Sequence, residues 1–377
     1  MKLKSLLSVS VLTMLPVAAV AQDTAKAPPC ENCADTMTIV SWGGAYQAMQ
    51  QKAYVQPYVA ATGVNIVWDE SSNEAVAKLR AQKEAGNVTW DVVDLLAADG
   101  IRLCDEGLVA EVPFDNWLAP APDGSPASKD FGKNLVSSCH IPTNLYSTTF
   151  GYRTDIAEWK GQVPTSVCDI FDLAKFPGKR ALEKRPINNL EWALICSGVP
   201  ADQVYDTLET DEGVQKALDK LGTIKDQTVW WSAGAETPQL LADKEVVIGS
   251  TYNGRLFSVI EEQKQPVAML WDYEVLDIDG FVVPVELPED RLNRVKHFLR
   301  FVTDTQHLAD QTKFISYGPA RASSQPLVGK HVDLGVAMAP HMPTSPENAK
   351  TGFLFNYAWW ADQRDELDAR FQSWLAQ

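Results

Sequence analysis

The sequence lacks the residue patterns by which most enzymes are recognised. Only five of its 377 residues are histidine, and none stands in a spacing that would place two metal ligands on one helix face. No serine lies in a G-x-S-x-G elbow, and neither a phosphate-binding P-loop nor a G-x-G-x-x-G turn is present. We therefore expect no catalytic residues, no cofactor and no metal site.

Basic charge is scarce as well. Lys and Arg number 33 against 49 Asp and Glu, which gives a formal net charge of −16. Binding to nucleic acid requires a basic face, so we exclude nucleic acid as a partner. An acidic chain suits a cationic ligand through long-range attraction, although the same charge also serves solubility.

Long apolar runs are missing beyond the first 20 residues. At the start, two lysines precede an apolar run that is broken by Pro16 and followed by a small-residue cleavage pattern. This predicts a secretory signal peptide over residues 1–21, followed by a polar segment at residues 22–36. The run is too short for a membrane anchor. We expect an exported, periplasmic protein that acts as a monomer.

Six cysteines, an even number in an exported chain, indicate disulfides. Cys30 and Cys33 form a C-x-x-C motif, which can be a redox motif or half of a zinc site. Here it lies outside any βαβ pattern and has no second such motif, so we favour a small structural loop. The other expected pairs are Cys104 with Cys139 and Cys168 with Cys196.

Strand-like and helix-like segments alternate from Met37 onward. The runs "MTIVSW", "VNIVWDES" and "WDVVDLLA" are typical of strands, and the segments between them carry apolar residues at helical spacing. After a turn-rich stretch at residues 118–133, the alternation resumes from Val163 to Arg255. This pattern predicts an α/β fold in which mainly parallel sheets are flanked by helices.

The strands divide into two groups, so we expect two lobes. Two β-like runs, at residues 147–153 and 275–285, stand where the chain would cross between them. Two lobes joined by two crossing strands would leave a cleft, and ligands of open α/β sheets bind at the carboxyl ends of strands. The expected boundaries are 37–146 plus 280–318 for lobe 1 and 147–279 plus 319–377 for lobe 2.

Aromatic residues recur where strands end. Several of them together would form a cage for an organic cation, through cation–π attraction and apolar contact; core packing is the alternative for each. Gly43 and Gly44 would let the chain turn tightly and let a ligand approach, although a carboxylate could also dock at such a helix start. The aromatic candidates are Trp42, Tyr46, Trp230, Trp231 and Tyr252.

Two acids in an apolar strand offer a counter-charge for the cation. Asp277 and Asp279 alternate with apolar residues, so both would face the same side of the strand. A carboxylate there could hold an ammonium group by a charge-assisted hydrogen bond. The alternative is a solvated strand end before Gly280.

Several segments resemble the periplasmic spermidine/putrescine-binding proteins of ABC importers. They are "SWGGAYQ", "DVVDL", "FPGKRAL", "WWSAGAETPQLLADKEVVIGSTYNGR" and "FISYGPA", in this order from Met37 to about Tyr317. The resemblance implies two hinged lobes that close on one amine-bearing solute and deliver it to an inner-membrane ABC permease. It also implies that Trp42 packs on a polyamine chain, that Asp279 holds an amino group and that Tyr317 lies in the cleft.

The departures from that family concern charge. Arg185 and Asn188 stand where an acidic site is expected, and Arg255 follows the Asn-Gly turn. An arginine in the cleft would suit a carboxylate, which it can bind in bidentate fashion; a surface ion pair is the alternative for both. Our main expectation is a polyamine ligand. The alternatives are a zwitterion, such as an amino acid, a 4-aminobutyrate-like compound or an opine, and a secreted enzyme with an unrecognised site.

Overall fold

The computed structural model describes residues 29–234 and 236–377. The predicted signal peptide at residues 1–21 lies outside the described residues, as does the first part of the polar segment. Within the described part of the chain, no helix is long and apolar enough to cross a membrane.

A single ten-stranded sheet runs through the molecule in the order β2-β1-β3-β8-β4-β7-β5-β6, with β10 beside β8 and β9 beside β4. Its strands are β1 (Thr36–Val40), β2 (Asn65–Asp69), β3 (Val92–Leu96), β4 (Ile141–Arg153), β5 (Arg180–Glu183), β6 (Thr228–Trp231), β7 (Ile248–Tyr252), β8 (Val267–Val282), β9 (Gly318–Pro319) and β10 (Phe353–Leu354).

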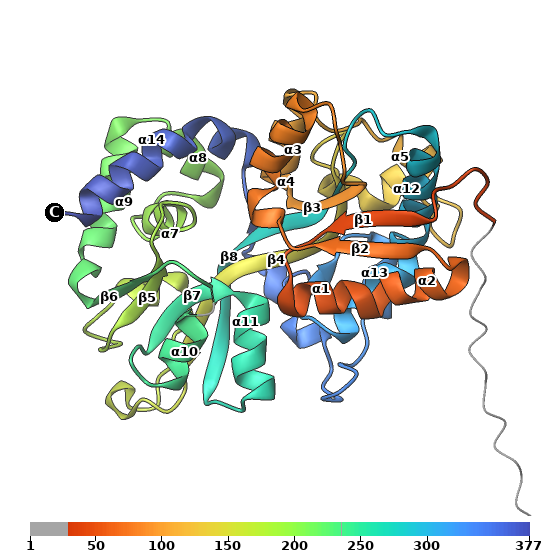
Figure 1. Ribbon diagram of the computed structural model, residues 1–377. Coiled ribbons are helices and arrows are strands. Elements are labelled where there is room, and N and C mark those ends of the chain that lie inside the picture. The colour runs from red at the N-terminus through yellow and green to blue at the C-terminus, as the bar shows by residue number, and fades with distance from the viewer. Residues whose placement is uncertain (1–28, 235) are drawn as a thin grey trace, which may run out of the picture.

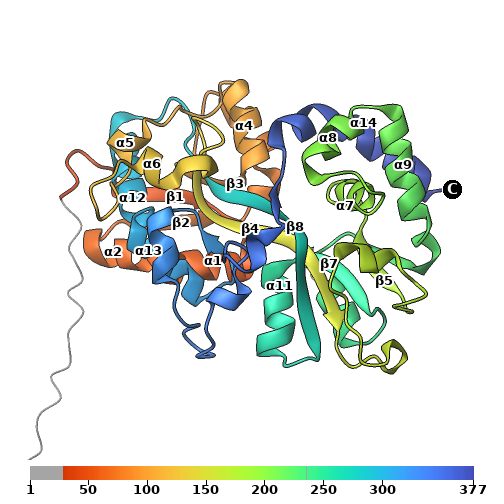
Figure 2. The ribbon, with the colours of Figure 1, turned by 180° about the vertical axis from the view of Figure 1, so that it is seen from behind.

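The sheet has two parallel parts with an antiparallel centre. Strand β1 pairs in parallel with β2 and β3, and β5 pairs in parallel with β6 and β7. The pairs β3–β8, β8–β4 and β4–β7 are antiparallel. We call the part with β1–β3 lobe 1 and the part with β5–β7 lobe 2. Figures 1 and 2 show helices packed around each lobe, with β4 and β8 passing through the middle of the molecule.

The helices of lobe 1 follow its strands in βαβ order. They are α1 (Gly44–Gln50), α2 (Gln56–Thr62), α3 (Ala75–Glu84), α4 (Ala97–Asp105), α5 (Phe114–Trp117), α6 (Ala127–Phe131), α12 (Glu289–Val302) and α13 (Thr305–Asp310). The helices of lobe 2 are α7 (Asn189–Ile195), α8 (Val204–Leu208), α9 (Asp211–Gly222), α10 (Glu236–Ala242), α11 (Asn253–Phe257) and α14 (Tyr357–Leu375).

The first helix shows how the sequence sets local structure. It runs from α1 through a π-helical turn (Gln51–Val55) into α2, without a break at Pro57. Pro57 has no N–H to bond to the turn before it, and the π turn directly before α2 accommodates this missing hydrogen bond. Gly63 ends the helix with φ 74°, as a left-handed residue after a helix does.

The two predicted crossing strands are β4 and β8. They are the longest strands, of 13 and 16 residues, and they pair with each other from Ile141↔Phe281 to Arg153↔Val267. The α/β fold with two lobes and two crossing strands is therefore confirmed. Since both strands pass from one lobe to the other, their central residues lie between the lobes.

The C-terminal part of the chain contacts both lobes. Arg321 and Ser323 bind Asp130 of α6 in lobe 1, whereas Arg370 of α14 pairs with Asp211 of α9 in lobe 2. In Figure 1 most of α14 lies over lobe 2, and its beginning lies near α4. The residue boundaries of the lobes stay a prediction.

The predicted disulfides are confirmed. Each of the two long-range pairs closes a loop within one lobe, with sequence separations of 35 and 28 residues. The third disulfide closes the C-x-x-C loop, which packs on α12 through a contact from the Cys30 sulfur to the Asn293 carbonyl. The pairs are Cys104–Cys139, Cys168–Cys196 and Cys30–Cys33.

Candidate ligand-binding site

The turn after β1 brings an indole to the edge of lobe 1. Gly43 and Gly44 have φ of 72° and 55°, which favours residues without a side chain. A Cβ atom on Gly43 would lie 3.0 Å from the Glu70 carboxyl oxygen. The glycine therefore allows Glu70, from the end of β2, to lie against the turn, and it leaves the Trp42 ring free to project towards the crossing strands.

Trp42 holds two carboxyl groups together. Its Nε1 lies 3.2 Å from an oxygen of Asp279 on β8 and 3.2 Å from an oxygen of Asp94 on β3. Asp94 is fully buried, and Asp279 is only 4% exposed. The Trp42–Asp279 contact brings together two residues that the sequence placed in the site, from positions far apart in the chain.

Asp94 accepts further hydrogen bonds from α1. The Tyr46 hydroxyl lies 3.3 Å from one carboxyl oxygen, and the Gln50 amide donates to the same oxygen. Asn144 of β4 in turn donates to the Tyr46 hydroxyl at 2.8 Å. Burial and the nearby Asp279 carboxyl raise the pKa of Asp94 well above its usual value. The pKa of Asp279 is raised to about 6, chiefly by burial.

A third acid, Asp277, lies on β8 two residues before Asp279. We call Asp94, Asp279 and Asp277 the acidic row. The Tyr146 hydroxyl donates to the Asp277 carboxyl at 2.8 Å, and the Tyr357 hydroxyl at the start of α14 bonds to it as well. Burial raises the pKa of Asp277, while these hydroxyls and the charge of Arg185 act against the rise. Asp277 and Asp279 pair with Tyr146 and Asn144 of β4, so all four share one face of the crossing strands.

Four tyrosines form a wall beside the acids. The ring centroids of Tyr46 and Tyr317 are 6.3 Å apart, those of Tyr146 and Tyr317 are 5.7 Å apart, and those of Tyr146 and Tyr252 are 5.6 Å apart. Trp231 is fully buried and supports Tyr252 from behind at 6.3 Å. The wall gives a ligand's hydrocarbon part an aromatic surface.

Lobe 2 contributes a guanidinium to this region. Arg185 follows β5 and pairs with Glu183, with Nε 2.6 Å from the carboxyl oxygen. Its side chain is 40% exposed, so it remains open to a further partner. Burial works to lower its pKa, but Glu183, Tyr252 and Tyr146 more than offset this and raise it. Arg185 is therefore a permanent positive charge near the tyrosine wall.

Arg255 lies near two of these tyrosines. Its positive charge acts to lower the pKa of Tyr252 and Tyr317. Arg255 also lines a cavity of about 340 Å³, together with Tyr46, Tyr317 and neighbouring residues of α1, α10 and α11. This cavity adjoins the acidic row without containing it.

The structure does not bring Trp230 into this group. Its ring packs on α14, 5.6 Å from Phe371 and 5.8 Å from Trp374. Trp230 and Trp231 are neighbours on a strand, so their side chains point to opposite faces and only Trp231 can reach Tyr252.

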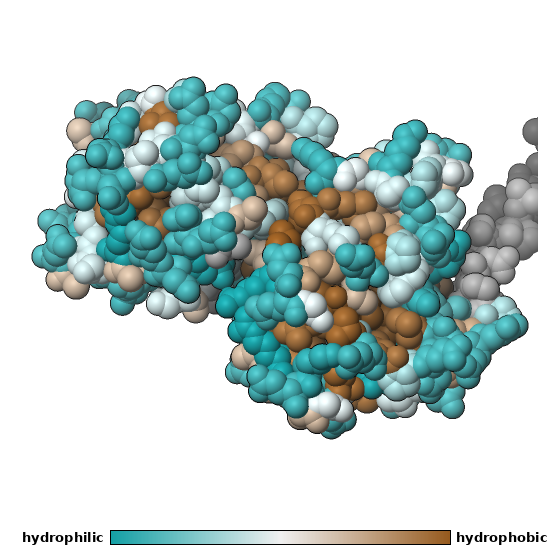
Figure 3. Space-filling model, turned by 90° about the horizontal axis from the view of Figure 1, so that it is seen from above, coloured by the Kyte–Doolittle hydropathy of each residue, from teal (hydrophilic) through white to brown (hydrophobic). Residues whose placement is uncertain are grey.

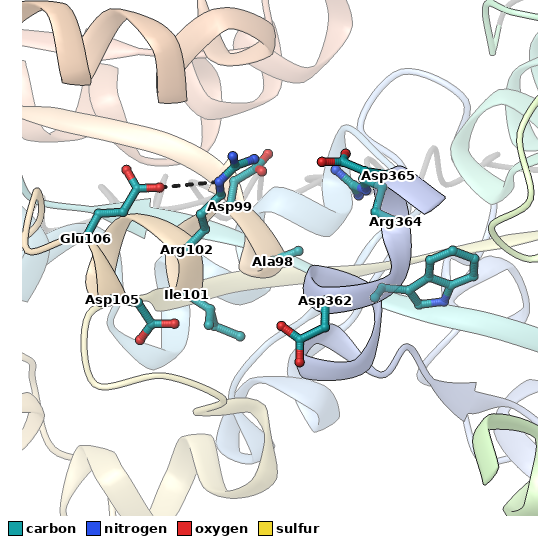
Figure 4. Close-up of a pocket in the computed structure, with 10 residues that line it drawn as sticks. Ala98, Asp99, Ile101, Arg102, Asp105, Glu106, Asp362, Arg364 and Asp365 are labelled. Carbon is teal, nitrogen blue, oxygen red and sulfur yellow. Dashed lines mark hydrogen bonds and ion pairs between the residues drawn. The ribbon is translucent and has the colours of Figure 1, made fainter. Parts of the chain in front are cut away.

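A second hollow of about 270 Å³ opens between the lobes, from α4 to the first half of α14. Figure 4 shows charged side chains facing one another across it, and Figure 3 shows a notch between the lobes with apolar residues beside it. Carboxylates outnumber guanidiniums here, and Arg364 acts across the gap on Asp99. Such an acidic rim attracts cations. The charged lining residues are Asp99, Arg102, Asp105, Glu106, Asp362, Arg364 and Asp365.

Sequence reasoning missed Asp94, Glu70, Tyr146 and Asn144. Asp94 stands inside the apolar run "DVVDLL", and that acid in a buried strand was the available signal. In the described part of the chain, no group of three or more His, Cys, Asp or Glu side chains is arranged to hold a metal ion.

Comparisons with known proteins agree with this architecture. Residues 53–344 match the family described as bacterial extracellular solute-binding protein. The chain belongs to this family. The chain is also 33% identical to the gamma-aminobutyric acid-binding protein of Pseudomonas aeruginosa, over 342 residues that cover 90% of this chain and 91% of that protein. Proteins of this kind bind small solutes and work with a membrane permease.

Two solved structures extend the comparison. The Atu4243 GABA receptor is 28% identical with a TM-score of 0.75, over 91% of this chain and 98% of that one. The binding protein MotA from A. tumefaciens B6, solved with glucopine, is 27% identical with a TM-score of 0.73, over 90% and 99%. The comparisons thus confirm an extracellular solute-binding protein but not the spermidine/putrescine-binding proteins in particular, and these names favour the zwitterion alternative over the polyamine that we expected.

Proposed function

We propose that the protein is the periplasmic solute-binding component of an ABC importer and that it captures an ω-amino acid of the 4-aminobutyrate type. The observation that carries this proposal is the opposite charge at the two ends of the site. The crossing strand β8 supplies the carboxyl of Asp279, held beside Trp42 of lobe 1, and lobe 2 supplies the guanidinium of Arg185. An ammonium group at one end of a ligand and a carboxylate at the other complement both.

The two charged groups stand at different places along the site, which favours a ligand whose own charges are separated by several carbons. Asp277 and Asp279 are two residues apart on β8, which separates their Cα atoms by about 6.6 Å. Arg185 acts on Asp277, so its guanidinium lies towards that end of the row. In extended 4-aminobutyrate the nitrogen and the carboxyl carbon are about 5 Å apart, whereas in an α-amino acid they are about 2.5 Å apart.

The surroundings of lobe 1 favour the ammonium group there. Glu70 lies against the Gly43 turn, so a carboxylate docked at the start of α1 would meet a like charge. The acidic rim between α4 and α14 would also attract the amine end. We therefore place the ammonium at Asp279 and Trp42, the carboxylate at Arg185, and the methylene groups along Tyr146 and the tyrosine wall.

The relatives support the same ligand class. Two of the proteins that this chain resembles are named for gamma-aminobutyric acid, and one was solved with glucopine. An opine is our second candidate, because the cavity of about 340 Å³ that Tyr46 and Tyr317 line has room for a longer ligand and carries Arg255.

The test is calorimetric titration of the exported chain with three four-carbon ligands: 4-aminobutyrate, putrescine and butyrate. Putrescine replaces the carboxylate by a second amine, and butyrate lacks the amine. We expect 4-aminobutyrate to bind at least about 100-fold more tightly than either, because each loses one charged contact in a desolvated site. Tighter binding of putrescine would overturn the proposal, and binding of an opine alone would favour the second candidate.

A further inference from the structure

Asp94 and Asp279 form a carboxyl pair removed from solvent. The two groups share the Trp42 donor, each with one oxygen 3.2 Å from its Nε1, and each carboxyl acts on the pKa of the other. Asp279 also accepts from the backbone N–H of Gly280 at 3.0 Å. Two carboxylates in contact away from water cannot both carry a charge, so one of them must hold a proton.

The environment of each carboxyl decides which one is protonated. Asp94 is fully buried, whereas Asp279 keeps 4% of its surface exposed. Burial raises the pKa of Asp94 first, and the charge of Asp279 raises it further. The hydrogen bond from Asp94 acts in the opposite direction on Asp279 and lowers its pKa. The proton therefore stays on Asp94, and Asp279 accepts its hydrogen bond.

No cation stands among the groups that act most strongly on the pair. Tyr46 and Gln50 of α1 and Tyr54 of the π turn face Asp94. The charge of Asp277 on β8 raises the pKa of Asp279, and the charge of Asp279 raises the pKa of Tyr146 on β4. Arg185 acts on Asp277, so an ammonium group bound at Asp279 would place a positive charge directly beside the pair.

We propose that Asp94 stays protonated when the ligand is bound and donates a hydrogen bond to Asp279, so that this end of the site offers one negative charge to one ammonium group. Asp94 is then a positioning residue that acts through Asp279. This inference rests on the proposed function, because it takes an amine as the group bound at Asp279.

Two consequences distinguish this arrangement from a pair of charged acids. Near pH 7.5 the ligand should bind without exchanging a proton. Below about pH 6, the pKa of Asp279, binding should release one proton, and affinity should fall as the pH falls, because the ammonium needs the charged form of Asp279.

The experiment compares three variants by calorimetry with 4-aminobutyrate at pH 7.5 and 5.0, in buffers of different ionisation enthalpy. Asp94→Asn is neutral like a protonated Asp94, and its amide can still donate a hydrogen bond to Asp279. We therefore expect the affinity of this variant to lie within about threefold of wild type. Asp279→Asn removes the charge, and we expect a loss of at least about 100-fold. Asp94→Leu removes the donor, so the midpoint of the pH profile should move upward.

Equal losses in Asp94→Asn and Asp279→Asn, or release of a proton at pH 7.5, would overturn the proposal. A readout without ligand separates its failure from that of the proposed function. Carbon-13 NMR of Asp-labelled protein, with Asp94 assigned through Asp94→Asn, should show a protonated Asp94 carboxyl at pH 7.5. A charged Asp94 in that spectrum overturns the inference whichever solute the protein binds.

Discussion

Glu274 on the crossing strand β8 should cost the protein stability at neutral pH. Its side chain is fully buried, and neither carboxyl oxygen makes a hydrogen bond of normal geometry within the described residues, although the Ser147 hydroxyl is near enough to act on its pKa. Burial raises its pKa from 4.5 to about 8, and Ser147 of β4 offsets only part of the rise. The folded protein therefore keeps Glu274 protonated where the unfolded chain has lost the proton.

The size of the effect follows from the two pKa values. Between 4.5 and about 8 the folded state binds more protons than the unfolded state, so stability falls as the pH rises through this window. Each pH unit in this window lowers the free energy of unfolding by about 1.4 kcal/mol, so the loss reaches up to about 4 kcal/mol at pH 7.5. Glu274→Gln has nearly the same shape and does not titrate, so the variant should avoid this loss.

The assay is equilibrium unfolding in guanidinium chloride, followed by tryptophan fluorescence, at several pH values from 5 to 8. We expect Glu274→Gln to match wild type within about 1 kcal/mol at pH 5 and to become the more stable protein by several kcal/mol at pH 7.5. The matched control is Glu245→Gln on the exposed surface, which should show no such trend. A difference between Glu274→Gln and wild type that stays constant from pH 5 to 8 would refute the reasoning.

Three further predictions concern the site and the disulfides. Arg185→Gln should weaken 4-aminobutyrate binding by about 30- to 1,000-fold in calorimetry, while Arg370→Gln, which removes another paired arginine, should have no effect; equal affinities would remove Arg185 from the site. Trp42→Phe keeps a ring but loses the donor to both acids, so we expect about tenfold weaker binding, with a larger loss in Trp42→Ala; unchanged affinity in both would show that Trp42 does not contact the ligand. Replacing Cys104 and Cys139 by serine opens a loop with a separation of 35 residues and should lower the free energy of unfolding by about 3–4 kcal/mol. Replacing Cys30 and Cys33, with a separation of 3, should lower it by less than about 2 kcal/mol. A larger loss for the short loop in chemical denaturation would contradict this order.

Local signals in the sequence were enough to predict the two-lobe architecture. The apolar runs around Gly151 and Asp279 are long and strand-like, and they became the crossing strands β4 and β8. The cysteine pairs followed from their positions within each half of the chain. These features depend on residues close together in sequence, or on which half of the chain holds each cysteine.

The acid pair depends on contacts that a sequence does not display. Asp94 reads as one polar residue in a buried strand, and only the pairing of β3 with β8 brings it beside Asp279. Trp230 and Trp231 are identical in type and adjacent, yet the pleat sends one to α14 and the other to Tyr252. Sequence alone cannot tell which face of such a strand meets the cleft.

The sequence did not decide between a polyamine and a zwitterion as the ligand, for a related reason. The segments that resemble polyamine binders form strands and turns of the scaffold, such as "DVVDL" and "FPGKRAL", which a family can share among ligands. The proposed charge pattern of the ligand depends on single residues such as Arg185, which folding brings near Tyr252 at the end of β7. That grouping becomes visible only after folding.

A crystal structure of the protein with 4-aminobutyrate tests the central claim most directly. We expect the ammonium nitrogen about 3 Å from the Asp279 carboxyl, beside the Trp42 ring, and the carboxylate on the Arg185 guanidinium. A carboxylate bound at the Gly43–Gly44 turn, or a ligand that touches neither Asp279 nor Arg185, would contradict the account.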